Sequence, residues 1–230
     1  MALSTIPARK KLFLLGGLGV IGVVTVIIVL LCGVGEPDLP GDTEQERVQA
    51  LARTSSKSTL ASAAENKSPR IRMAAMVRLT QVMDAEDRPI IEKAITDESP
   101  DVRALAAESL GQFNDAEATR KLAAIAASTK EDAKVRQAAL RGLVPCEAPQ
   151  AVVTLIEVAA DESAPNKVRF QAGKSALAKA GGKLNPDRRP ENKALWRDLI
   201  QRLKNDQRVR RAYGDAGVKL VDHSNDIVTD

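Results

Sequence analysis

Aromatic residues are scarce in this 230-residue chain, at only 2% of the total. Sheet proteins pack aromatic and β-branched side chains against one another, so the scarcity argues against a β-sandwich or a barrel. Alanine, which favours helices and lets them approach closely, is abundant wherever the sequence is charged. The composition therefore predicts an all-α fold.

Cysteine and histidine are almost absent as well. The two cysteines, Cys32 and Cys146, lie in an apolar segment and in a predicted helical region, so we expect no intramolecular disulfide. His223 is the only histidine, which argues against a His-based metal site. Cys146 has no histidine near it in the sequence to activate its thiol, so a buried hydrophobic role is favoured over a reactive one. We predict no catalytic residue, no cofactor and no metal, and hence a chain that is not an enzyme.

The formal charge is nearly balanced overall, at +4, but it is distributed unevenly. Residues 36–164 hold 16 basic and 22 acidic residues, whereas residues 165–221 hold 15 basic and 5 acidic ones. Solvated helix faces would account for this bias, and so would a basic surface that binds an acidic partner. Binding of nucleic acid is disfavoured, because few aromatic side chains exist to stack on bases.

One long apolar segment runs from Leu12 to Gly35 and contains no charged residue. Its 24 residues, at roughly 1.5 Å each in a helix, suffice to cross the hydrocarbon core of a membrane. Basic residues precede it and acidic residues follow it, an asymmetry that keeps residues 1–11 in the cytoplasm. We predict a single-pass anchor at 12–35 in a bacterial-type inner membrane, with the remainder of the chain on the outer side. Cleavage as a secretory signal near Gly35 is the alternative.

An internal repeat follows a proline-containing linker at 36–42. Small or apolar residues recur four and eight positions after each repeated isoleucine or valine, which traces one stripe along a helix. Other apolar segments alternate with these stripes, so each period of about 32 residues predicts an antiparallel pair of helices. The repeated pairs are spaced by 31, 33, 33 and 41 residues: Ile71-Arg72, Val102-Arg103, Val135-Arg136, Val168-Arg169 and Val209-Arg210.

Residues at the predicted helix starts agree with this register. Ser68 and Ser99 each precede a proline, which places a capping hydroxyl before a residue that suits the first helical position. Asn114 and Glu117 resemble a capping box at the start of another helix. A less regular helix over residues 43–64 is predicted to cap the repeats.

The segments SPDVRALAAESL at 99–110 and DAKVRQAALRGL at 132–143 resemble the second helix of HEAT repeats, and the short period looks most like the variant found in phycobilisome lyases. The resemblance implies an α-α superhelix over residues 43–222, with a tail at 223–230, whose surface binds other proteins. It also implies that the repeated arginines pack between neighbouring units against acidic or carbonyl groups, rather than lining a groove for an anion. The acidic residues that lie nearby in the sequence are Asp97, Asp101, Asp132 and Asp206.

The longest spacing between repeats contains an insertion at 181–190. Insertions in a solenoid map to loops on one face, often the binding face. Because the insertion and its flank are basic, we predict contacts to a partner here, with an ordinary solvated loop as the alternative. The candidate partner-binding residues are Lys183, Arg188, Arg189 and Lys193.

Together these features predict a membrane-anchored helical-repeat scaffold that binds a protein partner through its concave surface or its basic distal end. An enzyme or enzyme subunit related to the bilin lyases is one alternative, although the sequence singles out no chromophore pocket. Binding of a polyanion or nucleic acid by residues 165–221 is another, and it would weaken steeply with salt. The sequence gives no indication of oligomeric state.

Overall fold

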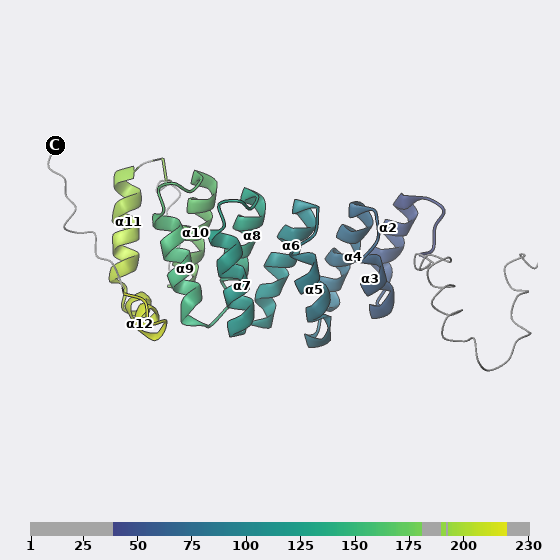
Figure 1. The fold of residues 1–230 in the computed structure, drawn as a ribbon, viewed down its shortest axis with the longest axis horizontal. Helices are drawn as coiled ribbons and strands as arrows, with labels where there is room; N and C mark the ends of the chain where they lie inside the picture. The colour runs from purple at the N-terminus through teal and green to yellow at the C-terminus, as the bar shows by residue number, and fades with distance from the viewer. Residues whose placement is uncertain (1–38, 181–189, 192, 220–230) are drawn as a thin grey trace, which may run out of the picture. The chain divides into compact units, whose positions relative to one another are not determined.

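The computed structural model describes residues 39–180, 190–191 and 193–219, which form helices joined by turns, with no strand in those ranges (Figure 1). The predicted all-α fold is confirmed for this part of the chain. The predicted anchor at 12–35 belongs to a separate unit, residues 1–38, which lies outside the described ranges. No described helix is long and apolar enough to cross a membrane.

Ten of the helices in the described ranges form five consecutive pairs. The first helices of the pairs are α3 (Lys57–Ala63), α5 (Arg88–Ala94), α7 (Ala116–Ala127), α9 (Pro149–Ala160) and α11 (Lys193–Asn205). The second helices carry the repeated Ile/Val-Arg pairs and are α4 (Pro69–Val82), α6 (Pro100–Leu110), α8 (Ala133–Gly142), α10 (Asn166–Lys179) and α12 (Gln207–Asp215). Short 3-10 turns at Ala85–Asp87 and Gly111–Phe113 precede α5 and follow α6.

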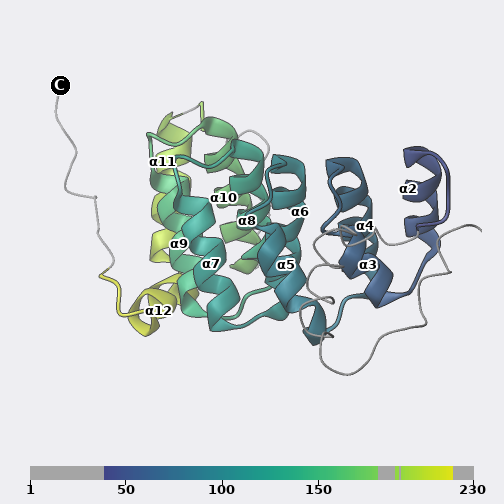
Figure 2. The ribbon, with the colours of Figure 1, turned by 45° about the vertical axis from the view of Figure 1, so that its right-hand side comes forward.

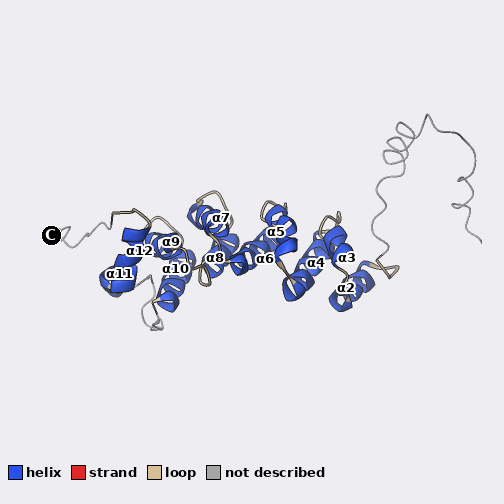
Figure 3. Cartoon of the chain, turned by 90° about the horizontal axis from the view of Figure 1, so that it is seen from below, coloured by secondary structure: helices blue, strands red, loops and turns tan. Residues whose placement is uncertain are grey.

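The pairs stack so that their helices form two layers. In Figure 3, α3, α5 and α7 lie on one side and α4, α6 and α8 on the other. Second helices pack on second helices, from α4 to α6 to α8 to α10, and α7 packs on α9 in the first layer. The second helices from α4 to α10 thus form a continuous layer, and α7 with α9 continues the first layer, as expected for a stack of repeated units.

The helix predicted over residues 43–64 is instead two helices. Thr43 opens α2 (Glu44–Arg53) with a capping box, and Ser56 caps α3 by accepting a hydrogen bond from the Thr59 amide. The polar side chains between Arg53 and Lys57 can hydrogen-bond to backbone groups at helix ends, so they favour a break over one continuous helix. As a result α3 is the first helix of a complete pair, while α2 packs on α4 at the end of the second layer (Figure 2).

Two of the predicted caps also differ from the structure. Ser68 caps α4 as expected, but the Ser99 hydroxyl makes no capping bond, and Asp97 accepts a hydrogen bond from the Ser99 amide instead. Asn114 does not cap α7, because it adopts a left-handed conformation (φ 47°) that asparagine tolerates well. Asp115 takes the cap position, and its carboxylate accepts from the Ala118 amide at 2.8 Å.

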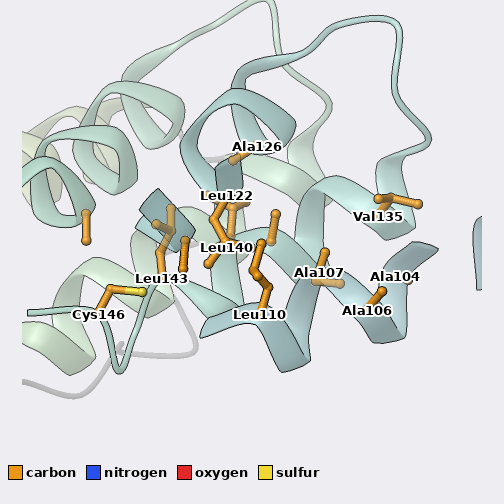
Figure 4. Close-up of a cluster of buried hydrophobic side chains, with 14 of the residues drawn as sticks. Ala104, Ala106, Ala107, Leu110, Leu122, Ala126, Val135, Leu140, Leu143 and Cys146 are labelled. Atoms are coloured by element: carbon orange, nitrogen blue, oxygen red, sulfur yellow. The ribbon is translucent and has the colours of Figure 1, made fainter. Parts of the chain in front are cut away.

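The repeated Ile/Val stripe lies in the core. The first residue of each repeated pair is at most 3% exposed, and the residues four positions later are buried as well. In the four regular second helices the residues eight positions later, which are Leu79, Leu110, Leu143 and Ala176, are at most 1% exposed. Figure 4 shows Leu110 and Leu143 in one cluster with Leu122 of α7 and Leu140 of α8. Burial of these aliphatic side chains is the main contribution to stability.

Two glycines set the closeness of α6 and α8. A methyl group at Gly111 would lie within 2.7 Å of the carbonyl carbon of Gly142 and closer still to its oxygen. A methyl group at Gly142 would in turn lie 2.7 Å from the carbonyl oxygen of Ala107. The backbones of adjacent second helices therefore touch at this end of the two helices, where any side chain would separate them.

We expect Gly111→Ala to destabilise the domain by about 1–3 kcal/mol, the usual cost of overpacking a close contact. The added methyl group would meet a backbone carbonyl, which cannot rotate away as a side chain can. Gly214→Ala in α12 is the matched control, since no atom lies within 4 Å of a methyl group placed there and alanine favours helix. Urea unfolding followed by circular dichroism measures both free energies, and equal stabilities would contradict the proposed contact.

The last pair is inverted relative to the other four. Between regular neighbours, helix starts meet helix starts, as when Lys134 at the start of α8 pairs with Asp101 at the start of α6. In contrast, Arg208 at the start of α12 donates to the carbonyl of Ala180, just after the end of α10. Packing of α12 is mainly against α9, a first helix, and the Tyr213 hydroxyl donates to Glu157 of α9 at 2.6 Å. The fifth Ile/Val-Arg pair is thus equivalent in sequence to the others but not in its packing.

Candidate binding surface

The second layer presents an open face whose side chains come from equivalent positions of successive helices. These positions lie one residue before, and two, three and six residues after, the repeated isoleucine or valine. We call this surface the second-helix face. Its residues in α4, α6, α8 and α10 are respectively Arg70, Met73, Ala74 and Val77; Asp101, Ala104, Leu105 and Glu108; Lys134, Gln137, Ala138 and Arg141; and Lys167, Phe170, Gln171 and Lys174. Ala104 and Ala138 at these positions are buried.

At the α4 end the second-helix face is hollowed into an apolar groove. The groove has a volume of about 590 Å³ and lies between α2, α4 and α6. Its floor is formed mainly by Val48 and Ala52 of α2 and by Met73, Ala74 and Val77 of α4. Val77 is 43% exposed, an unusual value for a large aliphatic side chain. An exposed concave apolar surface of this kind is typical of a contact site for another molecule.

In the middle of the face, opposite charges pair between neighbouring helices. Lys134 pairs with Asp101, and Arg141 pairs with Glu108 at 2.8 Å, so that each pair bridges α6 and α8. All four side chains are more than 40% exposed, so these ion pairs add little to stability. Their effect is to neutralise the charge of this part of the surface.

At the α10 end the face is basic. Lys167 and Lys174 occupy the positions of Lys134 and Arg141 one unit further along the stack, and both are exposed. Within the described ranges, neither ammonium group makes a hydrogen bond or an ion pair. The second-helix face therefore changes from apolar at α4, through paired charges at α6 and α8, to unpaired positive charge at α10.

Beneath this face, the first two repeated arginines connect their units to the next. Arg72 forms a bidentate pair with Asp97 of the following unit, with both N–O distances at 2.7 Å, and donates to two carbonyls of its own unit. Arg103 reaches the following unit through a single contact, from Nη2 to Glu131 at 2.8 Å, and also donates to two carbonyls of its own unit, while its buried Nε makes no hydrogen bond to the described residues. The planar guanidinium suits this role because it meets a carboxylate and carbonyls at once. Both pairs are partly buried, with 10–20% of each side chain exposed, and both join neighbouring units.

Arg136 and Arg169 continue the series further along the stack, where they are at least 94% buried. Each donates to a carbonyl near the end of the preceding first helix, that of Ala126 or Ala159. Hydrogen bonds from Ser163, together with the charges of Arg136 and Arg169, lower the pKa of Asp161.

Arg169 and Arg210 are the last two of the repeated arginines. The next partner along the stack from Arg169 is the Trp196 ring, with the guanidinium 6.0 Å from its centroid. Arg210 is exposed and donates to Asn205 within its own unit, so it joins no two units. Of the four aspartates near the repeated arginines, Asp97 alone pairs with one in the described ranges. The others have different roles: Asp101 pairs with Lys134, and Asp132 and Asp206 cap α8 and α12.

Cys146 is buried, and its thiol lies 3.3 Å from the carbonyl oxygen of Gly142. Burial raises the pKa of the Cys146 thiol and lowers that of the Lys179 ammonium beside it. Lys179 donates to the carbonyls of Val144 and Cys146, which lie just beyond the end of α8. Lys179 of α10 thus joins its unit to the preceding one. The raised pKa of the Cys146 thiol disfavours the nucleophilic thiolate. In the described part of the chain, no cluster of three or more His, Cys, Asp or Glu residues is arranged to hold a metal ion.

The four residues predicted to bind a partner are only partly described. Lys193 is exposed at the start of α11, whereas Lys183, Arg188 and Arg189 lie outside the described ranges. Sequence reasoning overlooked Lys167 and Lys174, although the repeat itself contains the signal. Both lysines stand at the same offsets from Val168 as Lys134 and Arg141 do from Val135.

Residues 88–116 match the family model for the HEAT repeat. The match covers α5 and α6, one complete helix pair, and the other described pairs repeat that arrangement with the inversion noted above. The chain is a HEAT-like helical repeat protein. The match is to the general repeat, so the phycobilisome-lyase variant remains a resemblance. A comparison with curated proteins finds no match.

Proposed function

We propose that the HEAT-like domain is a scaffold that binds a protein partner on its second-helix face. The observation that carries the proposal is the apolar groove between α2, α4 and α6, where Val77 is 43% exposed. HEAT repeats commonly mediate protein interactions, which agrees with this use of the face. Aliphatic side chains held in a concave surface on rigid helices contribute favourably to the free energy of binding when an apolar side chain of a partner displaces water from them.

We further propose that the scaffold is held at the outer side of a bacterial-type inner membrane by residues 12–35. This proposal is supported by the 24 uncharged, mainly apolar residues and by the basic residues before them. A chain cleaved near Gly35 and released is the alternative.

The action we propose is binding rather than catalysis. The groove is lined mainly by aliphatic side chains, and Arg78 at its edge is engaged with the carbonyl of Thr54 at 2.7 Å. An active site of the bilin-lyase kind would need polar groups that converge in a deep pocket. No observation favours that alternative over a scaffold.

A photo-crosslinking amino acid at position 77 of the full chain tests the scaffold proposal in the organism of origin. We expect illumination to trap a discrete protein adduct, because position 77 opens into the groove. The matched control places the same group at Ala124, an exposed residue of α7 in the first layer. Mass spectrometry identifies what is trapped. A discrete adduct from position 77 that is absent from position 124 supports the proposal, whereas adducts of equal yield, or none from position 77, would refute it.

A further inference from the structure

The face of α10 carries a specific arrangement of side chains. Lys167, Phe170 and Lys174 are spaced by three and seven residues, which places them along one side of a helix. The two lysines are thus two helical turns apart, about 10 Å along the axis. Phe170 lies between them, partly buried against the core.

Three observations bear on what this face binds. Its lysines have no acidic partner in the described part of the chain, whereas the equivalent charges on α8 are neutralised by Asp101 and Glu108. The buried Arg169 adds a further cation to the same helix, with its guanidinium 6.0 Å from the centre of the Trp196 ring. The half-buried Phe170 offers an apolar contact midway between the charges.

We propose that the α10 face, formed by Lys167, Phe170 and Lys174, binds an acidic amphipathic helix of a protein partner. Carboxylates two turns apart on that helix pair with the two lysines, and an apolar side chain between them packs on Phe170. This inference rests on the proposed scaffold function and adds the chemistry of the partner. A protein helix is favoured over a nucleic acid because the face has one partly buried ring and no row of exposed aromatics on which bases could stack.

Charge reversal on both sides of the contact tests the inference. The probe is a labelled, helix-stabilised peptide of about 20 residues, long enough to hold a helix, with glutamates at positions i and i+7 and a leucine at i+3. Binding to the full chain is measured by fluorescence anisotropy at low and high salt. We expect Lys167→Glu with Lys174→Glu to weaken binding at least about tenfold, because like charges then oppose each other. A peptide with lysines in place of the glutamates should recover binding to this variant.

The matched control is Arg120→Glu with Lys130→Glu, which changes the net charge equally. Arg120 lies on α7 and Lys130 in the turn before α8, and both are exposed. This control should bind the acidic peptide as the unmodified chain does. Equal weakening by the two double variants, or no rescue by the lysine peptide, would overturn the inference. A single-stranded oligonucleotide of the same charge that binds as tightly as the peptide would also overturn it.

The photo-crosslinking experiment separates this inference from the scaffold proposal. Lys167→Glu with Lys174→Glu is combined with the crosslinker at position 77, and the yield of the trapped adduct is compared with and without the reversal. A lower yield supports both proposals. An undiminished adduct, together with no binding of the acidic peptide, refutes the acidic helix and leaves the scaffold in place.

Discussion

Trp196→Ala is expected to lower the free energy of unfolding by about 3–5 kcal/mol, the usual cost of removing a fully buried tryptophan. Trp196 is 1% exposed, and its indole nitrogen donates to the carbonyl of Ala159 at 2.9 Å. Its ring packs on Gly173 of α10, where a methyl group would come within 3.0 Å of the ring. The substitution removes the largest buried side chain among the contacts that hold the inverted pair to α9 and α10, so the loss of stability should be concentrated in that pair.

Urea unfolding monitored by circular dichroism measures the effect of Trp196→Ala, and hydrogen exchange locates it. We expect lost protection in α11 and α12, with α4 and α6 nearly unchanged, because each unit of a stack rests on its neighbours. Trp196→Phe is the matched control, since it keeps an aromatic ring but loses the hydrogen bond to Ala159, and it should cost less. Uniform loss of protection along the chain would show that the last pair is not held separately.

Leu110→Ala should destabilise the domain by about 2–5 kcal/mol. Leu110 is fully buried near the end of α6, in the cluster with Leu122, Leu140 and Leu143 (Figure 4). The removed atoms lose their apolar surroundings, and the cavity left behind lies next to the rigid contact of Gly111 with the α8 backbone, which limits collapse.

The control for Leu110→Ala is the same substitution at Leu195, which is 39% exposed on α11. We expect its effect to stay below about 1 kcal/mol, as for most surface substitutions. Chemical unfolding of both variants under the same conditions compares the two free energies. A Leu110→Ala variant no less stable than Leu195→Ala would mean that the assigned core register is incorrect.

The repeat pattern predicts the regular part of the fold because its signal is local. In α4, α6, α8 and α10 the stripe of apolar residues faces an equivalent stripe one unit away. Burial of a residue in one of these helices therefore predicts burial of the equivalent residue in the next. The same pattern at Val209 predicts burial but not packing partners. Those depend on Trp196, whose ring fits against Gly173 from a distant part of the sequence, and on the longer connection before α11.

The sequence predicted where basic residues are concentrated better than it predicted which charged side chains form ion pairs. Net charge identified residues 165–221 as basic, yet it could not separate lysines that are paired from those that are not. The resemblance implied acidic or carbonyl partners for the repeated arginines, and Arg136 and Arg169 have the carbonyl kind, but the sequence did not separate the two kinds. Charge partners come from neighbouring units, about 33 residues away, as with Lys134 and Asp101.

The inverted last pair also bears on self-assembly. A stack of like units has two complementary ends, and copies that join end to end through them form open fibres. Here α12 begins at the end of α10 and packs mainly on α9, so this end of the described stack differs from the edge that a regular second helix would offer. An end-to-end contact between copies would therefore have to use an edge other than the regular one.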